Sequence, residues 1–168
     1  MRIRSIANWL NLSTPLGLAV ATGGGATLRP GPNGLRLAEG YRWTFPTGSA
    51  FTVGDVVITR TDFDRLLRWR PGLLEHEEVH ARQWMLCLGM PFIPLYLASM
   101  AWSMVRTGDR AARCLFEVRA GLHNGGYADV PVRPIRPVIA HDIHRLAPIV
   151  RRAAIFRRAT TRRPAARV

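Results

Sequence analysis

Hydrophobic and polar positions divide the first 130 residues into a β-rich half and a helical half. Residues 1–15 predict a short helix or lead-in, and the apolar run from Leu16 to Ala21 predicts a strand. Between 22 and 60, clusters of turn residues separate short runs of β-branched and aromatic side chains, as in antiparallel sheets. The dipeptide Asn33-Gly34 predicts a hairpin between strands at 26–28 and 35–43. A further strand is expected at 50–59, where Gly54 indicates a bulge or a tight bend.

Four helices are predicted between residues 60 and 130. The first spans 62–69 with Thr61 as its N-cap, and the second starts after Pro71-Gly72 and runs to about residue 88. The third, at 92–105, is apolar, and the fourth spans 110–123 before a glycine-rich stop. The predicted fold class is therefore α+β, with a small antiparallel β-sheet followed by a helical part.

The region between Arg82 and Arg106 contains 23 residues without charge, which raises the question of a membrane segment. A membrane-spanning helix needs about 20 continuous apolar residues, whereas Gly89, Pro91 and Pro94 interrupt this run. We therefore predict the end of one helix, a turn and a buried helix, with a membrane-inserted or membrane-resting segment as the open alternative. Because polar residues also break the apolar run near the N-terminus, a signal peptide is not expected. The predicted location is cytoplasmic, with possible membrane association.

Composition supports one main domain and a distinct tail. The chain has 168 residues and a formal net charge of +13, and its 24 basic side chains are all Arg. We predict a domain at 1–130 and a Pro/Arg-rich basic tail at 131–168, because the tail holds ten Arg and a single acid, Asp142. A basic amphipathic helix is expected at 144–158. The tail suits an anionic membrane surface, while nucleic acid is a less favoured partner because the tail lacks the aromatic interleaving that would support specific recognition of bases. A solvated tail without a partner is the other alternative.

The candidate chemistry lies in the sequence His76-Glu77-Glu78-Val79-His80, which has the pattern H-E-x-x-H. On a helix, residues i and i+4 share a face, so His76 and His80 can present two nitrogens to one metal ion, and Zn²⁺ suits such ligands. Glu77 lies about 100° round the helix, where it can act as general base on a water held by the metal. The alternative is a charged helix turn with an incidental pair of histidines.

Catalytic zinc requires a third protein ligand, and Glu117 is the candidate. It stands in an apolar stretch, and a buried carboxylate needs a partner. The alternative is an exposed Glu117 paired with Arg113. Other possible ligands are His123, Asp129, His141 and His144. The two cysteines, Cys87 and Cys114, do not have a zinc-binding spacing and are expected to be free thiols, although a disulfide remains an alternative.

H-E-x-x-H followed by Glu117-Val118-Arg119-Ala120 resembles the gluzincin group of zinc metallopeptidases. His80-Ala81-Arg82-Gln83 is also similar to compact bacterial domains of unknown function that carry H-E-x-x-H-x-x-Q. The resemblance implies a zincin-like fold, zinc held by His76, His80 and Glu117, and Glu77 as base and proton shuttle.

The same resemblance implies a peptide or protein substrate lying along the strand at 50–59. It leaves the residue that steadies the oxyanion open among Tyr96, His123 and Tyr127. The alternative function is a non-catalytic membrane-surface or nucleic-acid-associated protein that acts through residues 131–168, with zinc structural or absent.

Overall fold

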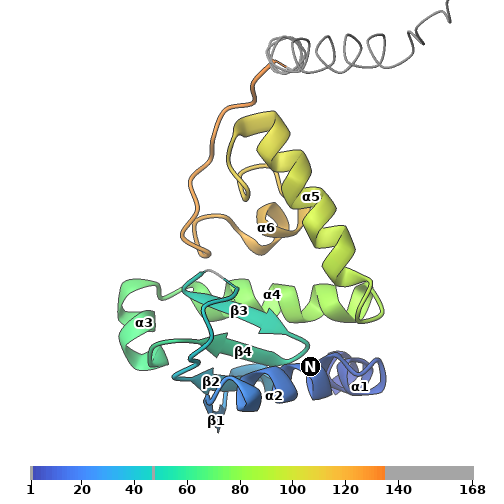
Figure 1. Cartoon of the computed structure of the whole chain (residues 1–168), viewed down its shortest axis with the longest axis vertical. Helices are drawn as coiled ribbons and strands as arrows, with labels where there is room; N and C mark the ends of the chain where they lie inside the picture. The colour runs from blue at the N-terminus through green and yellow to red at the C-terminus, as the bar shows by residue number, and fades with distance from the viewer. Residues whose placement is uncertain (1, 47, 135–168) are drawn as a thin grey trace, which may run out of the picture. The chain divides into compact units, whose positions relative to one another are not determined.

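The computed structural model describes residues 2–46 and 48–134, and those up to Pro131 belong to one compact unit. Within this part, six α-helices, one short 3-10 helix and a four-stranded sheet confirm the α+β class (Figure 1). The predicted helix at 144–158 and the candidate ligands His141 and His144 lie outside the described residues.

The chain begins with two helices, α1 (Arg2–Leu10) and α2 (Ser13–Gly23), so the predicted strand at 16–21 is wrong. The small residues Ser13, Gly17 and Ala21 recur every four positions and are all buried in α2. A Cβ on Gly17 would lie 2.3 Å from the carbonyl oxygen of Val53. These small residues allow a helix to lie directly against the sheet, and this explains why the apolar run at 16–21 is helical.

The sheet has the strand order β1-β2-β4-β3. Strands β1 (Thr27–Pro30) and β2 (Arg36–Glu39) form the predicted hairpin, with positive φ at Asn33 and Gly34, and the 3-10 turn η1 (Pro32–Gly34) lies between them. The predicted strand at 50–59 is bent sharply at Gly54 into β3 (Ala50–Val53) and β4 (Val56–Thr59).

The sheet is mixed rather than purely antiparallel, because β4 pairs in parallel with β2. After β2 the chain does not form the neighbouring strand first. It forms β3 at the edge of the sheet, and the β3–β4 hairpin then places β4 between β3 and β2. All four residues of β4 are buried.

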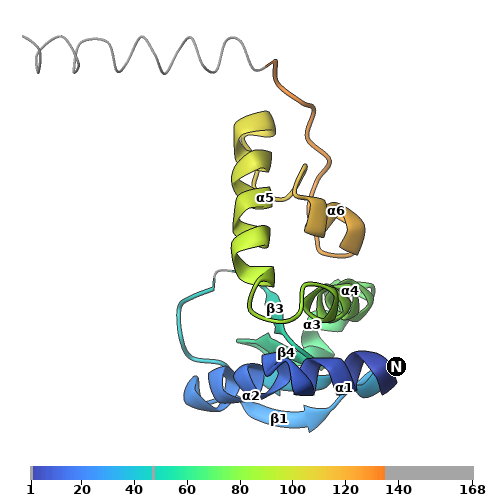
Figure 2. The same cartoon turned by 90° about the vertical axis from the view of Figure 1, so that its right-hand side faces the viewer.

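The two faces of the sheet are covered by different helices (Figures 1 and 2). Val56 and Ile58 pack in one cluster with Ala21 of α2. Val57 packs in a second cluster with Ala81 of α4 (Leu73–Leu86), the helix that carries H-E-x-x-H. Helix α4 is thus fixed by its burial against the sheet.

The remaining helices differ from the predictions in detail. Helix α3 (Phe63–Trp69) is capped by Asp62, not Thr61, since the Asp62 side chain accepts a hydrogen bond from the Arg65 amide. Helix α6 (Leu115–Ala120) is shorter than predicted, because the amides of residues 111 and 112 donate to the Asp109 side chain in a turn. Both cysteines are free thiols, as predicted.

Helix α5 (Phe92–Thr107) exists as predicted, but the expectation that it is buried is wrong. Only Phe92, Ser103 and Thr107 are buried in it. Among the described residues, no helix combines the length and the apolar character needed to cross a membrane.

Candidate metal centre

Helix α4 presents His76, Glu77 and His80 from a buried surface, and each of the three side chains is less than a tenth exposed. Two contacts from Thr52 of the edge strand β3 fix the rotation of the helix. The Thr52 hydroxyl donates to Glu77 Oε2 at 2.7 Å, and the Thr52 carbonyl accepts from Trp84 Nε1 at 2.9 Å. Because Glu77 and Trp84 are two helical turns apart, these contacts hold one face of α4 against β3.

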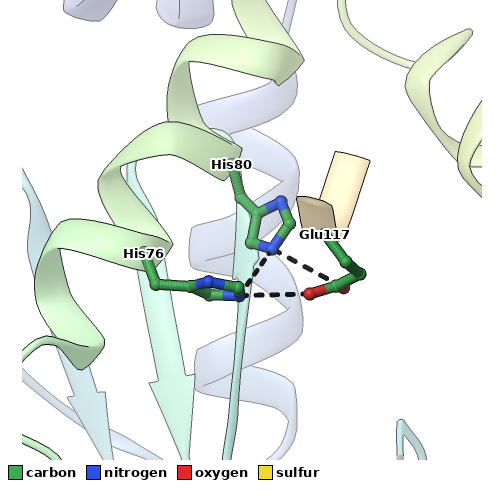
Figure 3. A group of neighbouring side chains, drawn as sticks. All are labelled: His76, His80 and Glu117. Carbon is green, nitrogen blue, oxygen red and sulfur yellow. Dashed lines mark hydrogen bonds and ion pairs between the residues drawn. The ribbon is translucent and has the colours of Figure 1, made fainter. Parts of the chain in front are cut away.

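Glu117 of α6 faces the two histidines of α4 (Figure 3). The two Nε2 atoms of His76 and His80 lie 3.0 Å apart. Glu117 Oε2 lies 3.2 Å from His76 Nε2, and Glu117 Oε1 lies 3.7 Å from His80 Nε2. The structure thus brings the three predicted ligand residues to one point.

Hydrogen bonds define the protonation of both imidazoles on the side away from this point. His76 Nδ1 lies 3.0 Å from the Gly121 carbonyl oxygen, and His80 Nδ1 lies 2.8 Å from Gln83 Oε1. The Gln83 amide is oriented by donating from Nε2 to the Phe116 carbonyl oxygen at 2.9 Å. Since both contacted oxygens only accept, each Nδ1 carries a proton, and Nε2 is the ring nitrogen that faces the neighbouring side chains.

Two ring nitrogens and one carboxylate therefore converge in a buried space. Glu117 Oε2 has no hydrogen-bond partner there. Lone pairs facing one another at these distances repel unless a cation or a proton lies between them. Tetrahedral zinc with ordinary Zn–N and Zn–O bonds separates its ligands by about 3.3 Å. The distances of 3.0, 3.2 and 3.7 Å, the last two to different oxygens of Glu117, lie around this value, so the three residues could hold a metal ion of this geometry.

The charges at the site are strongly coupled. Burial alone would raise the pKa of Glu117, but its close interactions with His76 and His80 hold that pKa far below its usual range. Burial alone would lower the pKa of His80, but Glu117 and the charge of Glu77 raise it. A proton that takes the place of a metal ion therefore resides on imidazole, while Glu117 stays ionised.

Two tyrosines line the site. The Tyr96 hydroxyl of α5 donates a hydrogen bond to Glu117 Oε1, and the pKa of Tyr96 is raised by burial and by the Glu117 charge. The ring of Tyr127 lies 6.2 Å from that of His76, and burial together with Glu117 raises the Tyr127 pKa to about 12. His123, the third predicted candidate for the oxyanion, is exposed.

The rival assignments for Glu117 and for the third ligand are not supported. Arg113 pairs with Asp129 at 3.2 Å, so the alternative of an exposed Glu117 paired with Arg113 is wrong. Among the described residues, His76, His80 and Glu117 form the one group with metal-binding spacing.

Two residues that position the site were not predicted. Gln83 was noted only as part of a resemblance, although its spacing of three residues from His80 places both on one face of α4. Thr52 had no sequence signal, because it is 25 residues from Glu77 and meets it only through the packing of β3 on α4.

Comparisons with known proteins were negative: no family model, no curated protein and no solved structure matches this chain.

Proposed function

We propose that this protein is a zinc-dependent metallopeptidase of the zincin-like type, with His76, His80 and Glu117 as ligands and Glu77 as general base. The observation that carries the proposal is the convergence of the two Nε2 atoms of His76 and His80 and the carboxylate of Glu117 in a buried space. A bound zinc ion supplies Lewis acidity and makes a neighbouring water more acidic.

The role of Glu77 follows from its neighbours. Its carboxylate is buried and fixed by the Thr52 hydroxyl, and its charge acts on both His80 and Tyr127. Glu77 takes the proton from the attacking water and returns it to the leaving amine as the peptide C–N bond breaks. Because β3 is an edge strand, an extended peptide aligned beside it passes close to Glu77.

Zinc content tests the ligand assignment. Purified wild-type protein should contain equimolar zinc by elemental analysis, and His80→Ala should lose it, because two remaining ligands do not hold catalytic zinc. His123→Ala is the matched control, since this histidine is exposed and should leave zinc content unchanged. A wild-type protein that does not take up zinc would reject the proposal.

Gln83→Ala should lower zinc affinity by about 10- to 100-fold, the usual cost of removing the partner that orients a ligating histidine. The variant removes the acceptor at 2.8 Å from His80 Nδ1. Competition with a chelator of known affinity measures the change. Gln83→Glu, which keeps an acceptor oxygen, should restore most of the affinity, and Arg82→Ala, on the exposed side of the helix, should behave as wild type.

The alternative role through the basic tail is supported by sequence alone, because residues 135–168 lie outside the described part of the chain.

A further inference from the structure

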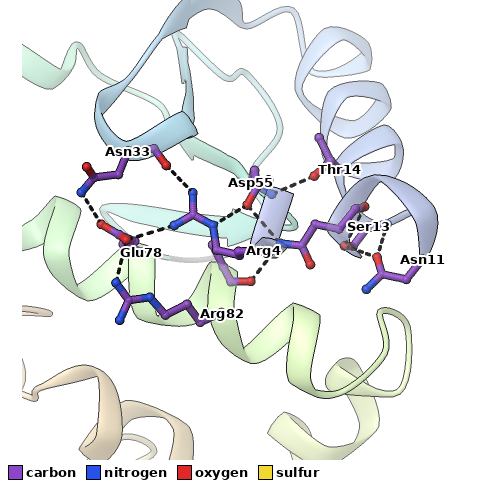
Figure 4. Close-up of polar contacts among 10 residues, drawn as sticks. Arg4, Asn11, Ser13, Thr14, Asn33, Asp55, Glu78 and Arg82 are labelled. Carbon is purple, nitrogen blue, oxygen red and sulfur yellow. Dashed lines mark hydrogen bonds and ion pairs between the residues drawn. The ribbon is translucent and has the colours of Figure 1, made fainter. Parts of the chain in front are cut away.

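Helix α1 is inside-out: its polar residues Arg4 and Asn8 face the protein, whereas apolar residues on its opposite face are exposed to solvent. Arg4 and Asn8, one turn apart, are 4% and 0% exposed. Arg4 contacts Asp55 and Glu78 in a buried polar network (Figure 4). The apolar residues of the opposite face are exposed by 79%, 58% and 79% at Ile3, Ile6 and Leu10. A surface helix of a water-soluble domain normally has the reverse arrangement.

Helix α5 repeats the pattern with hydroxyl groups on its inner face. Tyr96 donates to Glu117, Ser99 accepts from the Leu115 amide, and Ser103 donates to the Asp109 carbonyl oxygen. Its outer residues are apolar and between 38% and 53% exposed: Ile93, Leu95, Leu97, Trp102, Met104 and Val105. The hydroxyl groups on the inner side of α5 are therefore hydrogen-bonded within the protein, whereas the apolar side chains on its outer side are exposed.

The turn between α4 and α5 lies between the exposed apolar sides of α1 and α5. Leu86, the last residue of α4, is 72% exposed, and Leu88 and Met90 of the turn are 78% and 55% exposed. A Cβ on Gly89 would lie 2.8 Å from the Asn11 carbonyl oxygen, so the turn touches the end of α1 beside Leu10. Figure 2 shows α1, the turn and α5 along the same side of the molecule. We call the exposed apolar residues of these three elements the apolar face.

Charges around the apolar face indicate what covers it. Acidic residues are absent from 1–38 and from the stretch between Glu78 and Asp109. Basic residues stand at its border, where Arg36 stacks on Trp9 at 5.7 Å and Arg106 stacks on Trp102 at 5.3 Å. Tryptophan with arginine beside an acid-free apolar surface suits the headgroup level of an anionic bilayer, where Trp rings anchor and Arg residues meet lipid phosphates.

We propose that α1, the α4–α5 turn and α5 dock on the surface of an anionic lipid bilayer without crossing it. Scattered exposed apolar residues are common, but two inside-out helices joined by an exposed apolar turn indicate an interaction site. Because Tyr96 on the inner side of α5 contacts Glu117, docking holds the candidate metal centre beside the bilayer. The inference does not depend on whether the centre binds zinc.

The test uses the full chain and co-sedimentation with phosphatidylcholine vesicles that contain or lack phosphatidylglycerol. Wild-type protein should bind the anionic vesicles, and Leu88→Glu should lower the partition coefficient by about 10- to 100-fold, since a large apolar contact is replaced by a charge. Trp69→Glu is the matched control, because Trp69 on α3 is 80% exposed, like Leu88 at 78%, but lies outside the apolar face. This control should bind as strongly as wild type.

Measurements at high salt separate the apolar face from the basic tail, because salt screens the charges of residues 131–168 and leaves apolar contacts in place. The difference between Leu88→Glu and wild type should persist there. The proposal is overturned if wild-type protein does not bind anionic vesicles, or if Leu88→Glu binds them as strongly as wild type does. It is also overturned if the apolar face instead pairs two copies of the chain, seen as a wild-type dimer that Leu88→Glu converts to monomer without a change in vesicle binding.

Discussion

Replacing Glu77 by Gln should leave zinc content unchanged and lower peptide hydrolysis by about 10²- to 10⁴-fold, the range that a positioned general base contributes. The amide has the shape of the carboxylate and can still accept from the Thr52 hydroxyl, which lies 2.7 Å from Glu77 Oε2. It cannot take a proton from water at neutral pH. The measurement is kcat/KM on fluorogenic peptides together with elemental analysis of the same preparation.

Glu75→Gln is the control for this experiment, because Glu75 lies on the same helix but is exposed. It should hydrolyse peptides at the wild-type rate. Equal hydrolysis by Glu77→Gln and wild type would reject the mechanism. Zinc binding without hydrolysis in any of the three proteins would indicate a structural metal centre.

The candidate site was predictable from sequence where its geometry is local. The positions of His76 and His80 follow from helix spacing, which α4 keeps. Glu117 was predicted because a carboxylate in an apolar stretch needs a partner, and the structure brings it to the two histidines although α6 is shorter than expected. Their role as zinc ligands stays a prediction. Thr52 and the turn that follows α6 meet the site only through tertiary packing, which no spacing in the sequence encodes.

The fold was predictable to a similar extent. Turn chemistry at Asn33-Gly34 located the first hairpin, and capping and breaker residues located α3, α4 and α5. The parallel pairing of β2 with β4 was missed, because the pattern within a strand does not determine which neighbour it takes. The burial of α5 was also wrong, since periodicity defines two faces of a helix without stating which one is turned inward.

Arg4 shows why the inward face of α1 could not be predicted from the sequence. Its replacement is also expected to cause a large loss of stability. Its partners come from distant parts of the chain: its Nε lies 2.9 Å from Asp55 Oδ1, its Nη1 lies 3.1 Å from Glu78 Oε1, and its Nη2 donates to the Asn33 carbonyl oxygen at 2.7 Å (Figure 4). Arg4→Met keeps much of the volume but leaves two carboxylates buried without this cation. We expect a loss of about 3–5 kcal/mol in the free energy of unfolding, measured by urea denaturation.

Arg29→Met is the matched control, because Arg29 also pairs with two acids, Glu39 and Asp64, but its side chain is 41% exposed. Water screens that pair, so its loss should cost less than about 1 kcal/mol. If both variants lose a similar amount of unfolding free energy, burial of the Arg4 network does not determine its contribution to stability.

The pH dependence gives an independent signature of the Arg4 network. Burial alone would raise the pKa of Glu78, but hydrogen bonds from Asn33 and Arg82 and the charges of Arg82 and Arg4 hold it below its usual value. A carboxyl whose pKa is lowered by folding contributes stability that is complete above its unfolded pKa and is lost as the pH falls through the folded value. Wild-type protein should therefore lose stability as the medium is acidified below about pH 4.5, the ordinary Glu value. In Arg4→Met this loss should shrink, because without the Arg4 charge the pKa of Glu78 returns toward its ordinary value and protonation relieves a buried charge.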